Sequence, residues 1–288
     1  MNIEHFSTTC EDGVSLQGEL FIPERPRAVV QFSCGTATPT KVYRHFLSHI
    51  AQAGFICALW DYRGSEIYQE NLSQCQYQYA DYGRQDMPAV KQYLRQRFPE
   101  LPLVLLGHSA GGQQFGFMPD YSGVVGAISI GASSGYTGNM PLSYRLKAYW
   151  YFYAFMPASV AWRGYVATKS LGIMEDLPTG VATQWRDWCS KPDYFFDPQF
   201  RGQTLPADLF CDIHFPIQVY YASDDTIATP QNIDNFWRHV HSSAGVEIQQ
   251  LDSKELKVKR IDHFGYFSRA LKSQFWPQII ADINRFLD

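Results

Sequence analysis

Short apolar runs alternate with helical patterns along the first half of the chain. Each run has the length and composition of a buried strand, and each is followed by a turn that contains glycine or polar residues. Apolar strands that alternate with helices predict a parallel sheet covered by helices on both faces. The predicted strands cover residues 16–22, 28–32, 55–60, 103–106 and 124–132, and the predicted helices cover residues 42–53 and 86–98.

The alternation breaks near Ser133 and returns at residues 217–222, which form another apolar run. Beyond this run the pattern predicts a helix over residues 230–240, a strand over 246–251 and a closing helix over 275–287. The α/β rhythm therefore continues to the end of the chain, with one long interruption.

The interruption is rich in aromatic side chains, since 16 of the 65 residues from 136 to 200 are Phe, Trp or Tyr. A segment of this composition is not a solvated linker. An insertion between strands of an α/β sheet emerges at the edge where ligands bind. We therefore expect residues 1–132 and 211–288 to form an α/β core and residues 133–210 to form a mostly helical, aromatic-rich cap. The alternative is helical packing that only thickens the core.

Composition and charge narrow the class of protein. With 45% hydrophobic and 18% charged residues the chain is globular, and a net charge of −4 without a dense Lys/Arg cluster argues against a nucleic-acid partner.

No secretory signal is visible, and the most hydrophobic stretch, residues 149–162, is shorter than the ~20 residues of a spanning helix, so stable membrane insertion is not expected. Six scattered cysteines without a CxxC pair indicate reduced thiols in a cytoplasmic protein, and no metal or cofactor is indicated.

A serine lies in a Gly107-His108-Ser109-Ala110-Gly111 sequence, between a predicted strand and a predicted helix. This is the context that the G-x-S-x-G pattern requires. A serine on such a sharp turn exposes its hydroxyl, and the flanking glycines remove side chains that would clash there. The helix that follows supplies free N–H groups and a positive dipole end. Ser109 is therefore the candidate nucleophile, and the simpler alternative is a glycine-rich turn.

Together these features resemble the α/β-hydrolase superfamily over essentially the whole chain. The resemblance rests on the turn at Ser109, the glycine loop at residues 34–36, the turn at residues 61–64 and the insertion after the strand at Val124. It implies an α/β-hydrolase fold, with a mostly parallel central sheet, helices on both faces and a helical cap insertion. More narrowly, the chain is similar to bacterial hydrolases grouped with serine aminopeptidase-like and lysophospholipase-like sequences, a grouping that does not establish peptidase activity.

The resemblance also implies the remaining catalytic residues, in the order Ser…Asp…His. The loop at residues 222–230, ASDDTIATP, is similar to the family's G-x-x-D-x-I/V-x-x-P, with alanine where glycine is usual. Aligned in this way, Asp225 is the acid and Asp224 its neighbour, although the residues alone allow either carboxylate to orient the base. His263 lies in a sequence similar to the family's G-H-F-G and is the expected base.

The resemblance places the oxyanion hole at the backbone N–H groups of Ala110 and Thr36. The usual H-G of that loop is Cys34-Gly35 here, so Ala37 is a substitute donor if the loop is displaced. We expect the aromatic cap to form an apolar slot for the substrate. Its tentative substrate-binding residues are four tryptophans: Trp150, Trp162, Trp185 and Trp188.

A serine nucleophile favours acyl transfer over alkyl-enzyme chemistry. The predicted activity is hydrolysis of an ester or thioester of a small, partly apolar substrate through an acyl-enzyme on Ser109. One alternative is a small-peptide or amide hydrolase, which would use acidic cap residues such as Glu175 and Asp176, or Asp187, to hold an amino terminus. The other is a binding protein on a hydrolase fold with a retired triad. The oligomeric state stays open.

Overall fold

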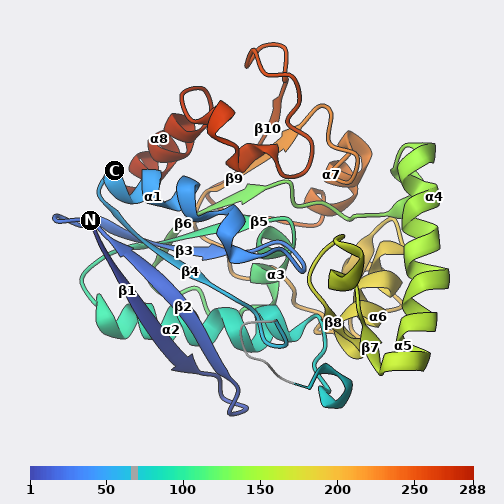
Figure 1. Cartoon of the computed structure of the whole chain (residues 1–288). Coiled ribbons are helices and arrows are strands. Elements are labelled where there is room, and N and C mark those ends of the chain that lie inside the picture. Colours follow the sequence, from blue (N-terminus) through green and yellow to red (C-terminus); the bar gives the residue numbers. More distant parts are fainter. Residues whose placement is uncertain (66–70) are drawn as a thin grey trace.

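The centre of the molecule is an eight-stranded, mostly parallel sheet (Figure 1), seen in a computed structural model that describes residues 1–65 and 71–288. The strand order is β1-β2-β4-β3-β5-β6-β9-β10. The β1–β2 and β2–β4 pairs are antiparallel, and all other neighbours in this sheet are parallel. The strands are β1 (Asn2–Thr9), β2 (Ser15–Ile22), β3 (Ala28–Ser33), β4 (Phe55–Trp60), β5 (Leu103–His108), β6 (Val124–Ile130), β9 (Ile217–Ala222) and β10 (Val246–Leu251).

Helices cover both faces of the sheet, so every residue of β3, β4 and β5 is buried. Figure 1 shows α1 and α8 on one side of the sheet and α2 on the other. Phe46 of α1 packs edge-on against Trp276 of α8, with the two ring centres 5.5 Å apart. The helices of this core are α1 (Arg44–Gln52), α2 (Met87–Arg97), α3 (Ala110–Gln114), α7 (Pro230–Trp237) and α8 (Trp276–Leu287).

A long segment is inserted between β6 and β9, and we call residues 133–210 the inserted segment. Most of its regular structure is helical: α4 (Leu142–Trp150), a π-helical turn (Tyr151–Phe155), α5 (Met156–Arg163) and α6 (Thr179–Cys189), with the small hairpin β7 (Tyr165–Val166) and β8 (Leu177–Pro178). Its later part packs into the same buried cluster as the sheet, since Phe195 contacts Phe236 of α7. The inserted segment therefore both projects from the core and adds to it.

The structure confirms the predicted α/β-hydrolase fold class, including the mostly parallel sheet. Most predicted strand and helix ends lie within three residues of the observed ones. The strand pattern did not predict β1, because this strand lies at the edge of the sheet and five of its eight positions are exposed, so its apolar signal is weak. None of the helices seen in residues 1–65 and 71–288 has the length and apolar character needed to cross a membrane.

The parallel strands bring the candidate residues to one edge of the sheet. Ser109 follows β5, Asp225 lies in the loop after β9 and His263 lies in the loop after β10. The carboxyl ends of parallel strands share an edge, which is where ligands bind in open α/β sheets. Residues far apart in sequence therefore meet there.

Candidate active site

Ser109 occupies a strained turn between β5 and α3. Its φ of +49° lies in the left-handed region, which residues with a side chain rarely adopt. The two glycines of the motif are needed for close approach. A Cβ on Gly107 would lie 2.3 Å from the carbonyl carbon of Gly111, and a Cβ on Gly111 would lie 2.0 Å from the carbonyl oxygen of Ser33. The turn thus holds the Ser109 hydroxyl at the edge of the sheet.

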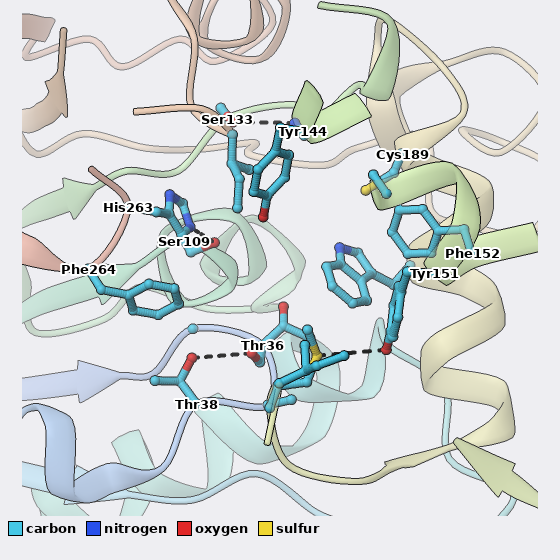
Figure 2. Close-up of a pocket in the computed structure, with 18 of the residues that line it drawn as sticks. Thr36, Thr38, Ser109, Ser133, Tyr144, Tyr151, Phe152, Cys189, His263 and Phe264 are labelled. Atoms are coloured by element: carbon cyan, nitrogen blue, oxygen red, sulfur yellow. Dashed lines mark hydrogen bonds between the residues drawn. The ribbon is translucent and has the colours of Figure 1, made fainter. Parts of the chain in front are cut away.

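His263 forms hydrogen bonds with Ser109 and Asp225 through its two ring nitrogens, and Figure 2 shows the bond to Ser109. Its Nδ1 lies 2.8 Å from Asp225 Oδ2, and its Nε2 lies 3.0 Å from Ser109 Oγ. A carboxylate only accepts hydrogen bonds, so Nδ1 carries the proton and Nε2 presents its lone pair to the Ser109 hydroxyl. This is the orientation that a general base for Ser109 requires.

Asp225 is buried, and hydrogen-bond donors surround its carboxylate. Its Oδ1 accepts the backbone N–H groups of Ile227 and Ala228 at 2.8 and 2.9 Å, and its Oδ2 accepts the Tyr266 hydroxyl at 3.3 Å besides His263. Burial alone would raise the pKa of Asp225, but the facing His263 and these donors hold it below its ordinary value. The carboxyl group is therefore a carboxylate at neutral pH.

The same ion pair sets the protonation of His263. Burial disfavours the imidazolium, yet the charge and hydrogen bond of Asp225 outweigh this effect and raise the pKa of His263 above its ordinary value of 6.5. The ring therefore accepts a proton more readily than an isolated histidine does.

Asp224 has a different position from its neighbour. Its two carboxylate oxygens accept the backbone N–H groups of Ile261 and Asp262, at 3.0 and 2.9 Å. Asp262 has a φ of +51°, so the chain bends sharply just before His263. Of the two carboxylates that the sequence left open, Asp225 contacts the imidazole, and Asp224 fixes the backbone of the loop that carries it.

His108 links the loops around the site, a role that the sequence analysis did not predict. Its Nε2 lies 2.9 Å from the carbonyl oxygen of His263, so Nε2 carries the proton. Its Nδ1 must then accept from the Tyr43 hydroxyl at 2.8 Å, and the Tyr43 oxygen accepts the Gly35 N–H at 3.0 Å. Burial, with the nearby His263, lowers the pKa of His108 to about 3, so the ring stays neutral. Nothing in the local sequence links Tyr43 to this network.

The predicted oxyanion-hole residues lie at the site. Ala110 begins α3 directly after Ser109, and Thr36 lies on the cavity wall in Figure 2. Within the described parts of the chain, neither backbone N–H donates a hydrogen bond to the protein. The substitute donor, Ala37, has a φ of +49°, and its carbonyl accepts the N–H of Glu175 from the inserted segment at 3.0 Å.

A cavity of about 600 Å³ opens beside Ser109 and His263. In Figure 2 these two side chains lie on one side of it, and Tyr151 and Phe152 of the inserted segment lie on the other. The lining is mostly apolar, and none of the described residues that line it is Asp or Glu. Lys147 contributes a positive charge to the wall. The site is therefore an apolar pocket with a few polar groups beside the serine.

The structure places two of the four predicted tryptophans at the cavity and two elsewhere. Trp150 and Trp185 line it, with the Trp185 ring 5.1 Å from that of Phe152. Trp188 is buried and packs between aromatic rings that include Phe117, because α6 turns it toward the core. Trp162 lies in the last turn of α5 and is 82% exposed. The structure therefore does not place Trp162 or Trp188 at the cavity, where Trp150 and Trp185 remain the candidates.

The described residues contain no group of three or more His, Cys, Asp or Glu side chains placed to hold a metal ion. Cys34, beside the oxyanion loop, is buried, and burial with the charge of Asp61 raises the pKa of its thiol well above the ordinary value. A thiol in this state is a poor nucleophile. Cys34 is therefore a weaker candidate nucleophile than Ser109.

Comparisons with known proteins agree with the fold. A family model described as serine aminopeptidase, S33, matches residues 24–176, just over half of the chain. A highly thermostable carboxyl esterase from Bacillus coagulans, solved in complex with glycerol, is 16% identical, with a TM-score of 0.65 and 100% of both chains covered.

Two further solved structures are similar over nearly their whole length. A monoglyceride lipase from Saccharomyces cerevisiae, in complex with a substrate analogue, is 14% identical, with a TM-score of 0.65 over 100% of this chain and 96% of that chain. An esterase domain from Rhodothermus marinus is 16% identical, with a TM-score of 0.59 over 100% of both chains. At these identities the likeness shows the fold alone. No curated protein matches the chain.

Proposed function

The chain belongs to the serine aminopeptidase S33 family of α/β-hydrolases, and from this premise we propose that it hydrolyses a carboxylic ester or thioester through an acyl-enzyme on Ser109. The observation that carries the proposal is the continuous hydrogen-bonded chain from Ser109 through His263 to Asp225, at the wall of an apolar cavity. Serine, imidazole and carboxylate in this geometry form an activated nucleophile.

Acylation begins when the Ser109 oxygen attacks the carbonyl carbon of the substrate and its proton passes to His263 Nε2. The imidazolium that forms is stabilised by the buried Asp225 carboxylate, which keeps its charge. The negative charge on the former carbonyl oxygen is met by the N–H groups of Ala110 and Thr36, neither of which donates a hydrogen bond to residues 1–65 or 71–288. His263 then protonates the departing alcohol or thiol, and the acyl group stays on Ser109.

Deacylation repeats these steps with water. His263 takes a proton from a water molecule that attacks the acyl carbonyl, and it returns the proton to the Ser109 oxygen as the acid departs. The free enzyme is restored without any other reactant. Asp225 and His108 hold the imidazole and its backbone in place through both halves of the cycle.

The apolar lining supports a substrate whose acyl or alcohol half is apolar. It also argues against the aminopeptidase alternative that the family's name suggests, because an amino terminus needs a carboxylate at the wall. Asp187 pairs with Arg186, and Asp176 accepts the backbone N–H of Lys169. Glu175 is absent from the lining. The inserted segment thus acts as a cap that supplies the apolar half of the site.

A substrate panel tests this proposal. We expect p-nitrophenyl acetate, butyrate and octanoate to be hydrolysed by the native chain, and aminoacyl p-nitroanilides to be hydrolysed at least about 100-fold more slowly in kcat/KM, since an amine bound without a carboxylate partner is poorly solvated. The Ser109→Ala variant is the blank for both series. If the chain preferred the aminoacyl anilides, it would be a peptidase and not an esterase. If neither series showed turnover that depends on Ser109, the result would support a binding protein.

A further inference from the structure

The outer surface of the inserted segment exposes an unusual number of large apolar side chains. Figure 1 shows α4 and α5 as one long helix along the outside of the molecule, continuous through the π-helical turn. From Leu142 to Tyr153 its large exposed apolar residues recur every three or four positions, which places them on one face of the helix. We call them the outer apolar face: Leu142, Leu146, Tyr149, Trp150 and Tyr153, with Trp162 at the C-terminal end.

The exposure of this face is large. Leu142 and Leu146 are each 60% exposed, and the rings of Tyr149 and Tyr153 lie 5.8 Å apart. Single exposed apolar residues are ordinary on a protein surface, but a row of them marks an interaction site. The helix therefore presents to solvent a face that would gain from being covered.

The charge around the face indicates what covers it. From residue 121 to residue 174 the chain has no Asp or Glu, although the whole chain has a net charge of −4. The same stretch carries four cations: Arg145, Lys147, Arg163 and Lys169. The last three are exposed. The charges carried by the helix itself are therefore all positive, and the nearby Asp187 of α6 pairs with Arg186. Such a face is complementary to a surface that is apolar inside and negative outside.

The outer apolar face is continuous with the mouth of the cavity. Trp150 belongs to the face, is half exposed and also lines the cavity. Two other half-exposed apolar residues, Ile173 and Phe264, line the cavity from neighbouring segments. A surface that covers the face therefore also meets the entrance to the site.

We propose that the outer apolar face docks on an anionic lipid surface and places the cavity mouth against it. The helix lies along the surface, with Leu142, Leu146 and Trp162 in the acyl boundary and the cations among the headgroups. Docking of this kind is peripheral and needs no spanning helix. It also names the substrate class of the site, an acyl ester of an amphiphile that enters from the lipid, and this second part rests on the proposed hydrolase function.

A second copy of the chain fits the face less well. A two-fold interface brings the same patch of both copies together, so the cations of one copy would face the cations of the other. The helix that forms the face, residues 142–163, carries Arg145, Lys147 and Arg163 and contains no carboxylate of its own. Like charges brought together in this way oppose association.

Sedimentation of the full chain with lipid vesicles tests the docking. We expect binding to vesicles of equimolar phosphatidylcholine and phosphatidylglycerol to be at least tenfold tighter than to phosphatidylcholine alone, because each cation near an anionic surface contributes about fivefold. High salt should remove this difference. Binding should also shift tryptophan emission to shorter wavelength, by less in a Trp162→Phe variant. Equal binding to the two kinds of vesicle, or none to either, would overturn the proposal.

Two sets of variants locate the surface. The Leu142→Gln, Leu146→Gln, Tyr153→Gln variant keeps good helix-forming residues and should weaken vesicle binding tenfold or more, while hydrolysis of a soluble ester is unchanged. The matched control, Ile3→Thr with Ile248→Thr, changes exposed apolar residues of two distant edge strands and should bind as the native chain does. If the triple variant does not fold, Trp162→Gln alone should give a smaller loss in the same direction.

The outcomes separate the two proposals. Vesicle binding without Ser109-dependent ester hydrolysis would retain the docking face and reject the hydrolase. Hydrolysis without vesicle binding would reject the docking face alone. A dimer in solution that the triple variant abolishes, with no vesicle binding, would assign the face to a second copy and overturn the lipid surface.

Discussion

The carboxyl edge of the sheet and the outer helix of the inserted segment depart from ordinary burial in opposite directions. At the sheet edge, polar groups such as Asp225 and His108 are buried, and each is held by hydrogen bonds. On the outer helix, apolar groups such as Leu146 and Trp162 are left in water. Burying a polar group costs free energy that its hydrogen bonds have to offset, and an exposed row of apolar side chains marks an interaction site. Both regions therefore carry features that folding alone does not favour, one for the proposed chemistry and one for the proposed recognition.

The largest expected effect lies at the sheet edge. Ser109→Ala should lower kcat for p-nitrophenyl butyrate by about 10⁶-fold, the scale on which loss of a triad nucleophile acts. The fold should persist, because the change removes one hydroxyl from a turn and leaves the glycine contacts intact. Steady-state kinetics with a mock-purified control, together with circular dichroism, make the measurement. Activity clearly above that control would remove Ser109 from the mechanism.

The adjacent carboxylates should differ by orders of magnitude. Asp225→Asn should cost about 10⁴-fold in kcat because the amide no longer fixes the imidazole tautomer. Asp224→Asn disturbs only the hydrogen bonds to the backbone of residues 261–262, and should cost no more than about 100-fold. Parallel kinetics of the two variants give the ranking. If Asp224→Asn were the more damaging change, Asp224 would be the group that controls His263.

Trp185 and Trp188 of α6 lie between the two regions. Replacing Trp188 should mainly change stability, and replacing Trp185 should mainly change substrate specificity. Trp188→Ala should lower the free energy of unfolding by about 3–5 kcal/mol, since the ring is buried among aromatic side chains. Trp185→Ala should cost less stability, because this ring is only half-buried at the cavity wall.

The dependence of activity on acyl-chain length tests whether the two tryptophans differ in specificity. In the native chain kcat/KM should rise with acyl length by up to about fourfold per methylene until the cavity is full. Trp185→Ala should move the length optimum, and Trp188→Ala should leave it in place at a temperature where the variant is folded. Urea unfolding and a p-nitrophenyl ester series measure the two quantities. The same length profile in all three proteins would show that Trp185 does not contact the acyl group.

Tyr43 tests the network behind the imidazole. Tyr43→Phe removes the hydroxyl that His108 and the Gly35 N–H both bind, and should lower kcat about tenfold with KM unchanged. A purely structural loss would lower the melting temperature and leave kcat per folded molecule as it was. Kinetics well below the melting temperature distinguish the two results, and an unchanged kcat would rule out a positioning role.

The shift of the midpoint in the pH–rate profile is the smallest expected effect, and it reports on the protonation of His263 directly. An imidazolium cannot accept the Ser109 proton, so kcat/KM should be low in acid and rise as His263 loses its proton. Because Asp225 raises the pKa of His263, the midpoint should lie above the ordinary value of about 6.5. The Asp225→Asn variant removes that charge, and its midpoint should move toward lower pH. A pH–rate profile that is flat, or a midpoint that Asp225→Asn leaves in place, would argue against this ion pair.

The sequence predicts the local features well and the non-local ones poorly. Residues 217–222 form the predicted strand to the residue, and the turn at Ser109 is where its glycines predict it, because both signals lie within a few adjacent positions. The network through Tyr43 is different. It joins positions 65 residues apart, and only the folded sheet brings them together. The sequence also does not separate the two tryptophans of α6, because a helix turns neighbouring residues to different surroundings: Trp185 lines the cavity and Trp188 is buried in the core.

Covalent labelling by a fluorophosphonate tests the central claim most directly, because the probe reacts with a serine only when a base activates it. The account predicts that the native chain is labelled at one residue, that mass spectrometry places the adduct on Ser109, and that Ser109→Ala is not labelled. Labelling of Asp225→Asn should be much slower than that of the native chain. The account would be contradicted if the native chain stayed unlabelled under conditions that label a known serine hydrolase. It would also be contradicted if the adduct still formed in Ser109→Ala.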